Sequence, residues 1–322
     1  MPAAAVNSES ILRELRDLWE QLGKDQKPGA SNGVLRACSM TLIVAAEGGG
    51  DQSDAEEARR TIGVLMHDHP SRAIVLCSRE SADLSARVFS ECWMPFGRQQ
   101  QICTEGMEVT ADPVNSEEVA RLLVPLIVPD LPVVLWCRGG RAFVDRSLDA
   151  LFPLADKIVF DSAEARYAPA AVDFLRRLRK QGHRVGDLAW TRLTGWREVV
   201  AHMFDPADES SADANAVREV KLTHGGGKAA SSAQYLATWI ERTLPGTKVT
   251  TEVVEGIQGL RSVAFSGEDV DLELSLAPPN FLEARSGSRK VCSVLPPVTE
   301  EALMREELSI LNSDPAFDRV LR

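Results

Sequence analysis

Short apolar runs rich in β-branched residues alternate with amphipathic stretches over the first 181 residues of the chain. The apolar runs are typical of strands buried on both faces, and the stretches between them place apolar residues on one side of a helix. This alternation predicts a Rossmann-like, mostly parallel sheet covered by helices. The expected strands are 34–46, 73–77, 101–110, 128–136 and 157–161, and the expected helices are 9–22, 53–66, 117–126 and 169–181.

The pattern changes after residue 205. A polar, acidic stretch at 206–215 indicates an exposed linker, and short β-runs separated by turns follow it, with one helix at 231–243. Runs of this length favour an antiparallel meander. We therefore expect an α/β domain over residues 1–205 and a smaller α+β domain with an antiparallel sheet over residues 206–322.

The expected parallel sheet lacks a phosphate-binding loop, because no strand is followed by GxGxxG and no GxxxxGK[ST] occurs. We interpret the glycine runs 48–50 and 225–227 as turns. Arg138 and Arg141 flank two glycines directly after a strand, at the place where open α/β sheets bind ligands. The two guanidinium groups there fit a phosphate or a carboxylate, and a tight glycine turn with solvated charges accounts for the same residues equally well.

Tryptophan and arginine are concentrated at 187–205, in the residues Trp190, Arg192, Trp196 and Arg197. An apolar stripe at helical spacing runs through the same stretch: Leu193, Trp196, Val200 and Met203. With Asp187 as N-cap, this pattern predicts one amphipathic helix on which Arg192 lies over Trp196. Two interpretations stay open. Either the tryptophans fill a core and the arginines are solvated, or the two residue types together form a recognition surface.

Charge limits the class of partner. The formal net charge of −11 argues against nucleic acid and against an anionic membrane surface. No apolar run reaches the ~18 residues of a membrane span, and the first ten residues do not resemble a secretory signal. We expect a cytoplasmic protein.

Patterns that carry chemistry are scarce. GxSxG is absent, the paired carboxylates lie on helix faces, and the histidines are isolated or, at His67 and His69, wrongly spaced for a metal. The six cysteines include no CxxC, so we expect reduced thiols, with a Cys92–Cys103 redox pair as the less favoured alternative. The sequence thus favours a binding protein over an enzyme, with no cofactor and no metal.

Three blocks carry a resemblance to a known family: His69-Pro70-Ser71-Arg72 with the strand after it, the segment 125–139, and 187–205. In the third block, the arrangement DLxWxRxxxWR resembles that of the OpcA family, the glucose-6-phosphate dehydrogenase assembly proteins. The resemblance implies a non-catalytic partner that binds glucose-6-phosphate dehydrogenase and promotes its active oligomeric state in the oxidative pentose phosphate pathway.

The resemblance also implies a set of partner- or ligand-binding residues: Trp136, Arg138, Trp190, Arg192, Trp196 and Arg197, to which we add Arg141 and, as secondary members, His69, Ser71 and Arg72. The alternative is a sugar-phosphate-binding enzyme or sensor that uses Arg138 and Arg141 at the strand end.

Overall fold

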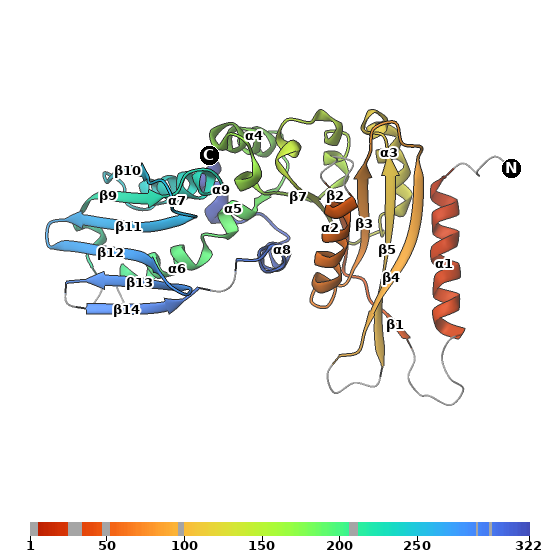
Figure 1. Cartoon of the computed structure of the whole chain (residues 1–322), viewed down its shortest axis with the longest axis horizontal. Coiled ribbons are helices and arrows are strands. Elements are labelled where there is room, and N and C mark those ends of the chain that lie inside the picture. The colour runs from red at the N-terminus through yellow and green to blue at the C-terminus, as the bar shows by residue number, and fades with distance from the viewer. Residues whose placement is uncertain are drawn as a thin grey trace. The chain divides into compact units, whose positions relative to one another are not determined.

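A computed structural model describes residues 6–24, 34–46, 52–95, 100–205, 212–287, 289–295 and 298–322 (Figure 1). The chain divides into two compact units. The first unit comprises Met1–Phe160, His183–Val185 and Glu307–Asn312, and the second comprises Asp161–Gly182, Gly186–Glu306 and Ser313–Arg322. The domain boundary expected above, between residues 205 and 206, stays a prediction.

An eight-stranded sheet organises the first unit, in the order β1-β5-β3-β2-β6-β7-β8, with β4 paired to β5. Its strands are β1 (Val34–Arg36), β2 (Met40–Ala46), β3 (Ser71–Ser78), β4 (Ser85–Trp93), β5 (Gln101–Ala111), β6 (Val133–Cys137), β7 (Lys157–Phe160) and β8 (Val185–Asp187). The pairs β1–β5, β3–β5, β2–β3, β2–β6 and β6–β7 are parallel, and β4 is antiparallel to β5. The predicted mostly parallel α/β sheet is confirmed.

The core of this sheet lies at its central strands. Every residue of β2, β6 and β7 is buried, which explains their continuous apolar sequences. Helix α1 (Ser8–Lys24) packs against β4, and α2 (Gln52–Leu65) packs against β2 and β3. Helix α3 (Ser116–Leu123) contributes Val119, Leu122 and Leu123 to the buried set.

The single strand predicted at 34–46 is wrong, because the chain breaks into β1 and β2. Between them, the Ala37 amide donates to Cys103 O on β5, and the Ser39 amide donates to Pro70 O just before β3. The chain changes its neighbours at this point, since β1 pairs with β5 whereas β2 pairs with β3 and β6. An apolar pattern does not record such a change of partner.

A six-stranded sheet organises the second unit, in the order β10-β9-β11-β12-β13-β14. Its strands are β9 (Val217–His224), β10 (Lys248–Val253), β11 (Leu260–Gly267), β12 (Val270–Ala277), β13 (Phe281–Ser286) and β14 (Arg289–Val294). The meander is confirmed for β11 to β14, which pair antiparallel. It is wrong for β9 and β10, which pair in parallel because helix α7 (Ala229–Thr243) crosses over between them.

The remaining α-helices of the described residues are α4 (Ala168–Lys180), α5 (Leu188–Thr191), α6 (Thr194–Met203), α8 (Glu300–Ser309) and α9 (Pro315–Leu321). The sequence did not predict α9, whose Phe317, Val320 and Leu321 are buried. None of the helices in the described ranges combines the length and the apolar character that crossing a membrane requires.

Two cysteines differ from the expectation of reduced thiols. Cys92 on β4 and Cys103 on β5 lie directly opposite each other and form a disulfide, with their Cα atoms 4.1 Å apart. The antiparallel register explains the bond, because directly opposed residues on neighbouring strands bring their Cβ atoms together. Cys38, Cys77, Cys137 and Cys292 are free.

Candidate functional site around the tryptophan and arginine motif

The motif at 187–205 folds as two short helices. Strand β8 ends at Asp187, α5 begins at the next residue, and α6 follows after a break at Arg192 and Leu193. The predicted N-cap is confirmed, because Oδ1 of Asp187 accepts a hydrogen bond of 2.9 Å from the Ala189 amide. The prediction of one continuous helix is wrong, and the break sends the side chains on either side of it to different partners.

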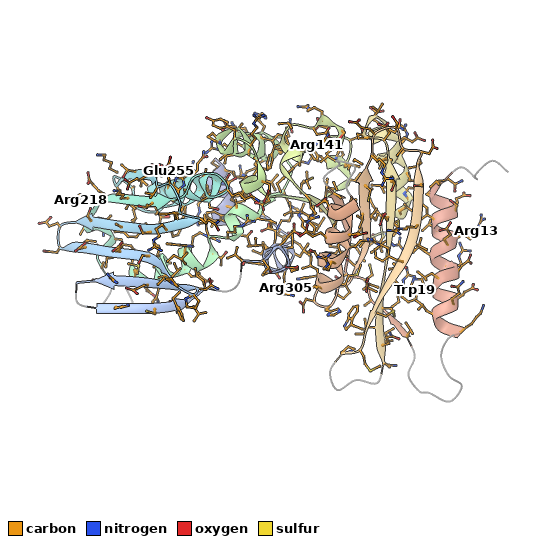
Figure 2. The ribbon with its side chains drawn as sticks, viewed as in Figure 1. Arg13, Trp19, Arg141, Arg218, Glu255 and Arg305 are labelled. Carbon is orange, nitrogen blue, oxygen red and sulfur yellow. A yellow bond between two sulfur atoms is a disulfide. The ribbon has the colours of Figure 1, made fainter. Side chains whose placement is uncertain are left out.

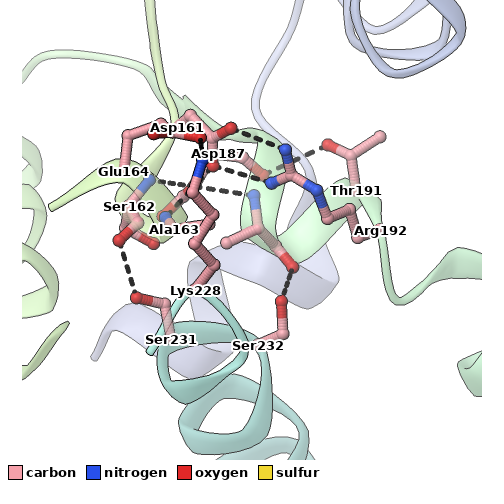
Figure 3. Close-up of polar contacts among 11 residues, drawn as sticks. Asp161, Ser162, Ala163, Glu164, Asp187, Thr191, Arg192, Lys228, Ser231 and Ser232 are labelled. Carbon is pink, nitrogen blue, oxygen red and sulfur yellow. Dashed lines mark hydrogen bonds and ion pairs between the residues drawn. The ribbon is translucent and has the colours of Figure 1, made fainter. Parts of the chain in front are cut away.

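Asp187 takes part in a network of polar contacts in the second unit (Figure 3). Its Oδ1 also accepts from the Ser162 amide at 3.0 Å, and its Oδ2 accepts from the Tyr235 hydroxyl on α7 at 2.7 Å. Burial raises the pKa of Asp187 to about 6, and the charge of Asp161 adds to this shift. Burial together with the Asp187 carboxylate raises the pKa of Tyr235 well above its usual value. Asp187 and Tyr235 therefore form a fully buried hydrogen bond that joins the start of α5 to α7.

Arg192 forms a bidentate ion pair with Asp161, the residue that follows β7. Nη1 and Nη2 of Arg192 donate to the two carboxylate oxygens at 2.7 and 2.6 Å. Burial opposes the charged guanidinium, but the hydrogen bonds and charge of Asp161 outweigh it and raise the pKa of Arg192. The predicted position of Arg192 over Trp196 is thus wrong, because a planar carboxylate offers two charge-assisted bonds.

Trp190 and Arg197 lock α5 and α6 to the C-terminal helix α9. The indole Nε1 of Trp190 donates to Oδ2 of Asp314 at 2.8 Å, and its ring stacks on Phe317 with centroids 5.4 Å apart. The guanidinium of Arg197 lies 3.8 Å from the centroid of the Trp190 ring. Trp190 and Trp196 are only 2% and 5% exposed. The tryptophans therefore belong to the core, and the two arginines are half-buried and have protein partners.

The first turn of α7 binds the same group of segments. Ser231 donates to Ser162 O at 2.9 Å, and Ser232 donates to Ala189 O at 2.8 Å. Lys228, just before the helix, forms an ion pair of 2.5 Å with Glu164. The glycine run 225–227 is a turn, as predicted, and joins β9 to α7.

A cavity of about 370 Å³ opens beside these residues. The motif contributes Arg192, Leu193 and Trp196 to its wall. The segment at the start of α7 contributes Lys228, Ala229 and Ser232. Most of the remaining wall is aliphatic and comes from the six-stranded sheet and the residues that flank it: Leu260, Leu276, Leu295 and Val298. Three residues of the motif, Arg192, Leu193 and Trp196, thus line a cavity.

The other predicted site residues lie in the first unit. Trp136 is 1% exposed within β6. Arg138 follows the strand and pairs with Asp54 and with Glu57 on α2, the latter at 3.6 Å. Arg141 is exposed in the turn beyond (Figure 2). The charge of Arg138 is thus already compensated by two carboxylates.

The block that contains His69, Ser71 and Arg72 belongs to a buried ion-pair cluster. Arg72 donates to Glu105 at 2.6 Å and to Leu126 O at 2.8 Å. Trp19 lies on α1 (Figure 2). Its indole donates to the other oxygen of Glu105, and Arg36 donates to Glu105 at 2.6 Å. Burial opposes ionisation of Glu105, but these bonds and charges prevail and lower its pKa. His69 is half-buried and Ser71 is buried near this cluster.

The predicted residues thus fall in both units: Trp190, Arg192, Trp196 and Arg197 belong to the second unit, and the others belong to the first. Sequence reasoning missed the partners that organise the motif: Asp161, Tyr235, Lys228 and Asp314. The only signal was the position of Asp161 as the last residue of a predicted strand. Within the described ranges, no cluster of His, Cys, Asp and Glu is arranged to hold a metal ion.

Comparisons with known proteins cover both units. The family model described as the glucose-6-phosphate dehydrogenase subunit N-terminal domain matches residues 63–180, and the corresponding C-terminal domain model matches residues 183–321. A putative OxPP cycle protein OpcA from Synechococcus elongatus is 26% identical over 286 residues, which are 86% of this chain and 58% of the relative. The OpcA of Synechocystis sp. is 24% identical over 66% of this chain and 46% of its own length.

The chain thus spans about half the length of the curated relatives it matches. Among solved structures, a 3-ketoreductase from Actinomadura kijaniata in complex with NADP and TDP-benzene aligns with a TM-score of 0.47 and 11% identity. That alignment covers 90% of this chain and 94% of the reductase. The two domain models together account for most of the sequence, including the motif at 187–205, and the chain belongs to the OpcA family of glucose-6-phosphate dehydrogenase subunits.

Proposed function

We propose that this chain is a non-catalytic assembly factor that binds glucose-6-phosphate dehydrogenase and promotes its active oligomeric state. The observation that carries the proposal is the match of both parts of the chain to domains described as those of a glucose-6-phosphate dehydrogenase subunit. The names of the curated relatives support a role in the oxidative pentose phosphate cycle. A cytoplasmic location, where that cycle takes place, is part of the proposal.

The proposed mechanism is a population shift. A partner that binds the active oligomer more tightly than the inactive state moves the equilibrium toward the active form. A difference of about 2 kcal/mol in binding free energy changes the ratio of the two states roughly 30-fold. The chain needs no chemistry of its own for this effect.

The motif residues divide into two groups under this proposal. Trp136 and Trp190 are nearly inaccessible, so they act by holding the elements that present a surface. Arg192 is 27% exposed at the cavity and Arg141 is exposed, so a partner or ligand reaches these two directly. Trp196 is buried and forms part of the cavity wall.

The alternative, a sugar-phosphate site at Arg138 and Arg141, has less support from the geometry. Arg138 would have to leave Asp54 and Glu57 to bind a phosphate, and breaking a largely buried pair is costly. Calorimetry with glucose 6-phosphate, 6-phosphogluconate and NADP separates the two proposals. Tight binding to the isolated chain, together with turnover, would favour the alternative.

The test is a kinetic assay of the cognate dehydrogenase with increasing amounts of this chain. We expect Vmax or the apparent affinity for glucose 6-phosphate to change and then saturate. Heat-denatured chain serves as the control for nonspecific protein effects. Unchanged Vmax and KM at a molar excess of folded chain would reject the proposal.

A further inference from the structure

We propose that the cavity beside the motif binds a small organic anion with an apolar body, that is, a carboxylate or phosphate group attached to an aromatic or hydrocarbon part. The residues that line the cavity in the structure all come from this chain. This site therefore goes beyond the proposed association with the dehydrogenase and does not depend on it.

The charges in the wall favour an anion. Of the 13 described residues that line the cavity, two are charged, and both are cations: Arg192 and Lys228. Their ion-pair partners, Asp161 and Glu164, are not among the lining residues. Helix α7, 15 residues long, begins at the wall with Ala229, so the positive end of its dipole adds to the same potential.

Arg192 is held ready to bind. Its bidentate bond to Asp161 fixes the plane of the guanidinium, while its side chain stays 27% exposed and forms part of the wall. Two of its N–H groups go to Asp161 among the described residues, and an arginine carries further donors. A preorganised donor of this kind loses little entropy when a ligand binds.

Lys228 supplies a second, adjustable charge. Its side chain is 74% exposed, and a surface pair such as that with Glu164 contributes little to stability. The ammonium group therefore turns from Glu164 toward an incoming anion at small cost. One fixed and one adjustable cation allow the site to take either a planar carboxylate or a tetrahedral phosphate.

The rest of the wall favours an apolar body. Five apolar residues line this part of the cavity: Leu193, Trp196, Leu260, Leu276 and Leu295. Ser232 and Asn280 are the two uncharged polar side chains among the described lining residues. Most hydroxyl groups of a sugar would therefore lack hydrogen-bond partners in this cavity, which is unfavourable. The volume of about 370 Å³ lies in the range of small-molecule pockets and exceeds what an inorganic phosphate fills.

Phenyl phosphate is the probe, titrated into the full chain by isothermal calorimetry. We expect one saturable site with Kd below about 1 mM. Inorganic phosphate, which lacks the ring, and phenol, which lacks the charge, should each bind at least about tenfold more weakly. Absence of saturable binding would overturn the proposal, and so would equal affinity for inorganic phosphate and phenyl phosphate.

Matched variants locate the site. Lys228→Met keeps most of the apolar stem and should weaken phenyl phosphate about five- to tenfold, because one cation is lost. Lys248→Met is the control, since Lys248 is also an exposed lysine paired with a glutamate in the second unit, and it should leave the affinity unchanged. Equal effects of the two variants would contradict the assignment.

Leu276→Trp provides an independent test by filling the cavity. We expect it to abolish phenyl phosphate binding in protein that still melts cooperatively. Unchanged affinity in this variant would place the ligand elsewhere. Should the variant fail to fold, the comparison of Lys228→Met with Lys248→Met still decides the question.

Discussion

Asp187 combines three structural duties in one buried carboxylate. It caps α5, receives the amide of Ser162, and accepts the hydroxyl of Tyr235 from α7. The groups that act on it and on Tyr235 are Asp161, Arg192 and Arg176, which extend the network through one side of the second unit. Ionisation at this position opposes folding, because the pKa in the fold, about 6, exceeds the usual value of 3.8.

The sign of the resulting pH dependence follows from linkage. A carboxyl group with a raised folded pKa binds its proton earlier in the folded state, so its contribution to stability grows as the pH falls from about 7 toward about 4. Asp187→Asn keeps an oxygen acceptor for the two amides and removes the charge. We expect urea unfolding at several pH values to show a loss of this contribution in the variant. If the free energy of unfolding changed between pH 7 and pH 4.5 by the same amount in Asp187→Asn as in the unchanged chain, the assignment of this pH dependence to Asp187 would be contradicted.

Glu105 is the opposite case, a buried carboxylate held ionised by three partners. Glu105→Gln should destabilise the chain by about 3–5 kcal/mol, because it leaves the buried guanidinium of Arg72 without a charge partner. Glu108→Gln, on the same strand but paired with more exposed arginines, is the control and should lose about 1 kcal/mol or less. If the two variants lost the same free energy of unfolding in urea, burial of the ion pair would not determine its contribution to stability.

Local chemistry at single residues is readable from sequence, whereas tertiary partners are not. The N-cap role of Asp187 was predictable because it depends on residues within two positions. Its bond to Tyr235 spans 48 residues, and the pairing of Arg192 with Asp161 spans 31. A spacing pattern does not identify partners so distant in sequence. A solvated arginine and an ion-paired arginine therefore cannot be distinguished from the sequence pattern.

Helix α9 depends on the motif through Trp190. The Trp190 indole bonds to Asp314, which also caps α9 by accepting from the Ala316 and Phe317 amides. Trp190→Phe keeps an aromatic ring against Phe317 but removes the indole N–H. We expect a loss of about 1–3 kcal/mol in thermal or urea unfolding, since a half-buried carboxylate oxygen loses its donor.

Trp196→Phe is the matched control for this experiment. Trp196 is similarly buried, and the described residues offer its indole no hydrogen-bond acceptor. The control should therefore lose less stability than Trp190→Phe. A larger loss in the control would mean that ring volume, and not the bond to Asp314, sets the stability of this region.

The disulfide between β4 and β5 closes a short loop. Cys92 and Cys103 are separated by 11 positions in sequence, and for a loop of this length chain-entropy arguments give a stabilisation of about 2–3 kcal/mol. Reduction, or the double change Cys92→Ser and Cys103→Ser, should lower the free energy of unfolding by that amount. Cys292→Ser, at an exposed free thiol, should have no effect. Mass spectrometry after alkylation without reductant checks the bond directly.

Strands and helices were predictable where a period or an apolar run is long. The central strands β2, β3 and β6 were found for this reason, as were α1, α4 and α7. Strand β8 was missed because three residues carry no period. The helix between β9 and β10 was predicted at 231–243, but their parallel pairing was not, because the short runs that follow favoured antiparallel hairpins.

At the scale of the entire chain, the fold class and the family could be predicted from the sequence, but the arrangement of the candidate site residues could not. Rossmann-like alternation and the spacing of Trp190, Arg192, Trp196 and Arg197 sufficed for the family, which the domain matches support. The same residues did not reveal that Trp136 and Arg138 lie in a different unit from the motif. A spacing motif records which residues occur together, and not whether they touch.

Association with the dehydrogenase is tested most directly by sedimentation velocity of fluorescently labelled cognate glucose-6-phosphate dehydrogenase with and without this chain. Our account predicts that folded chain shifts the labelled enzyme to a larger, saturable species that contains both proteins. An enzyme boundary that stays at the same sedimentation coefficient over the full titration, with this chain sedimenting separately, would contradict it.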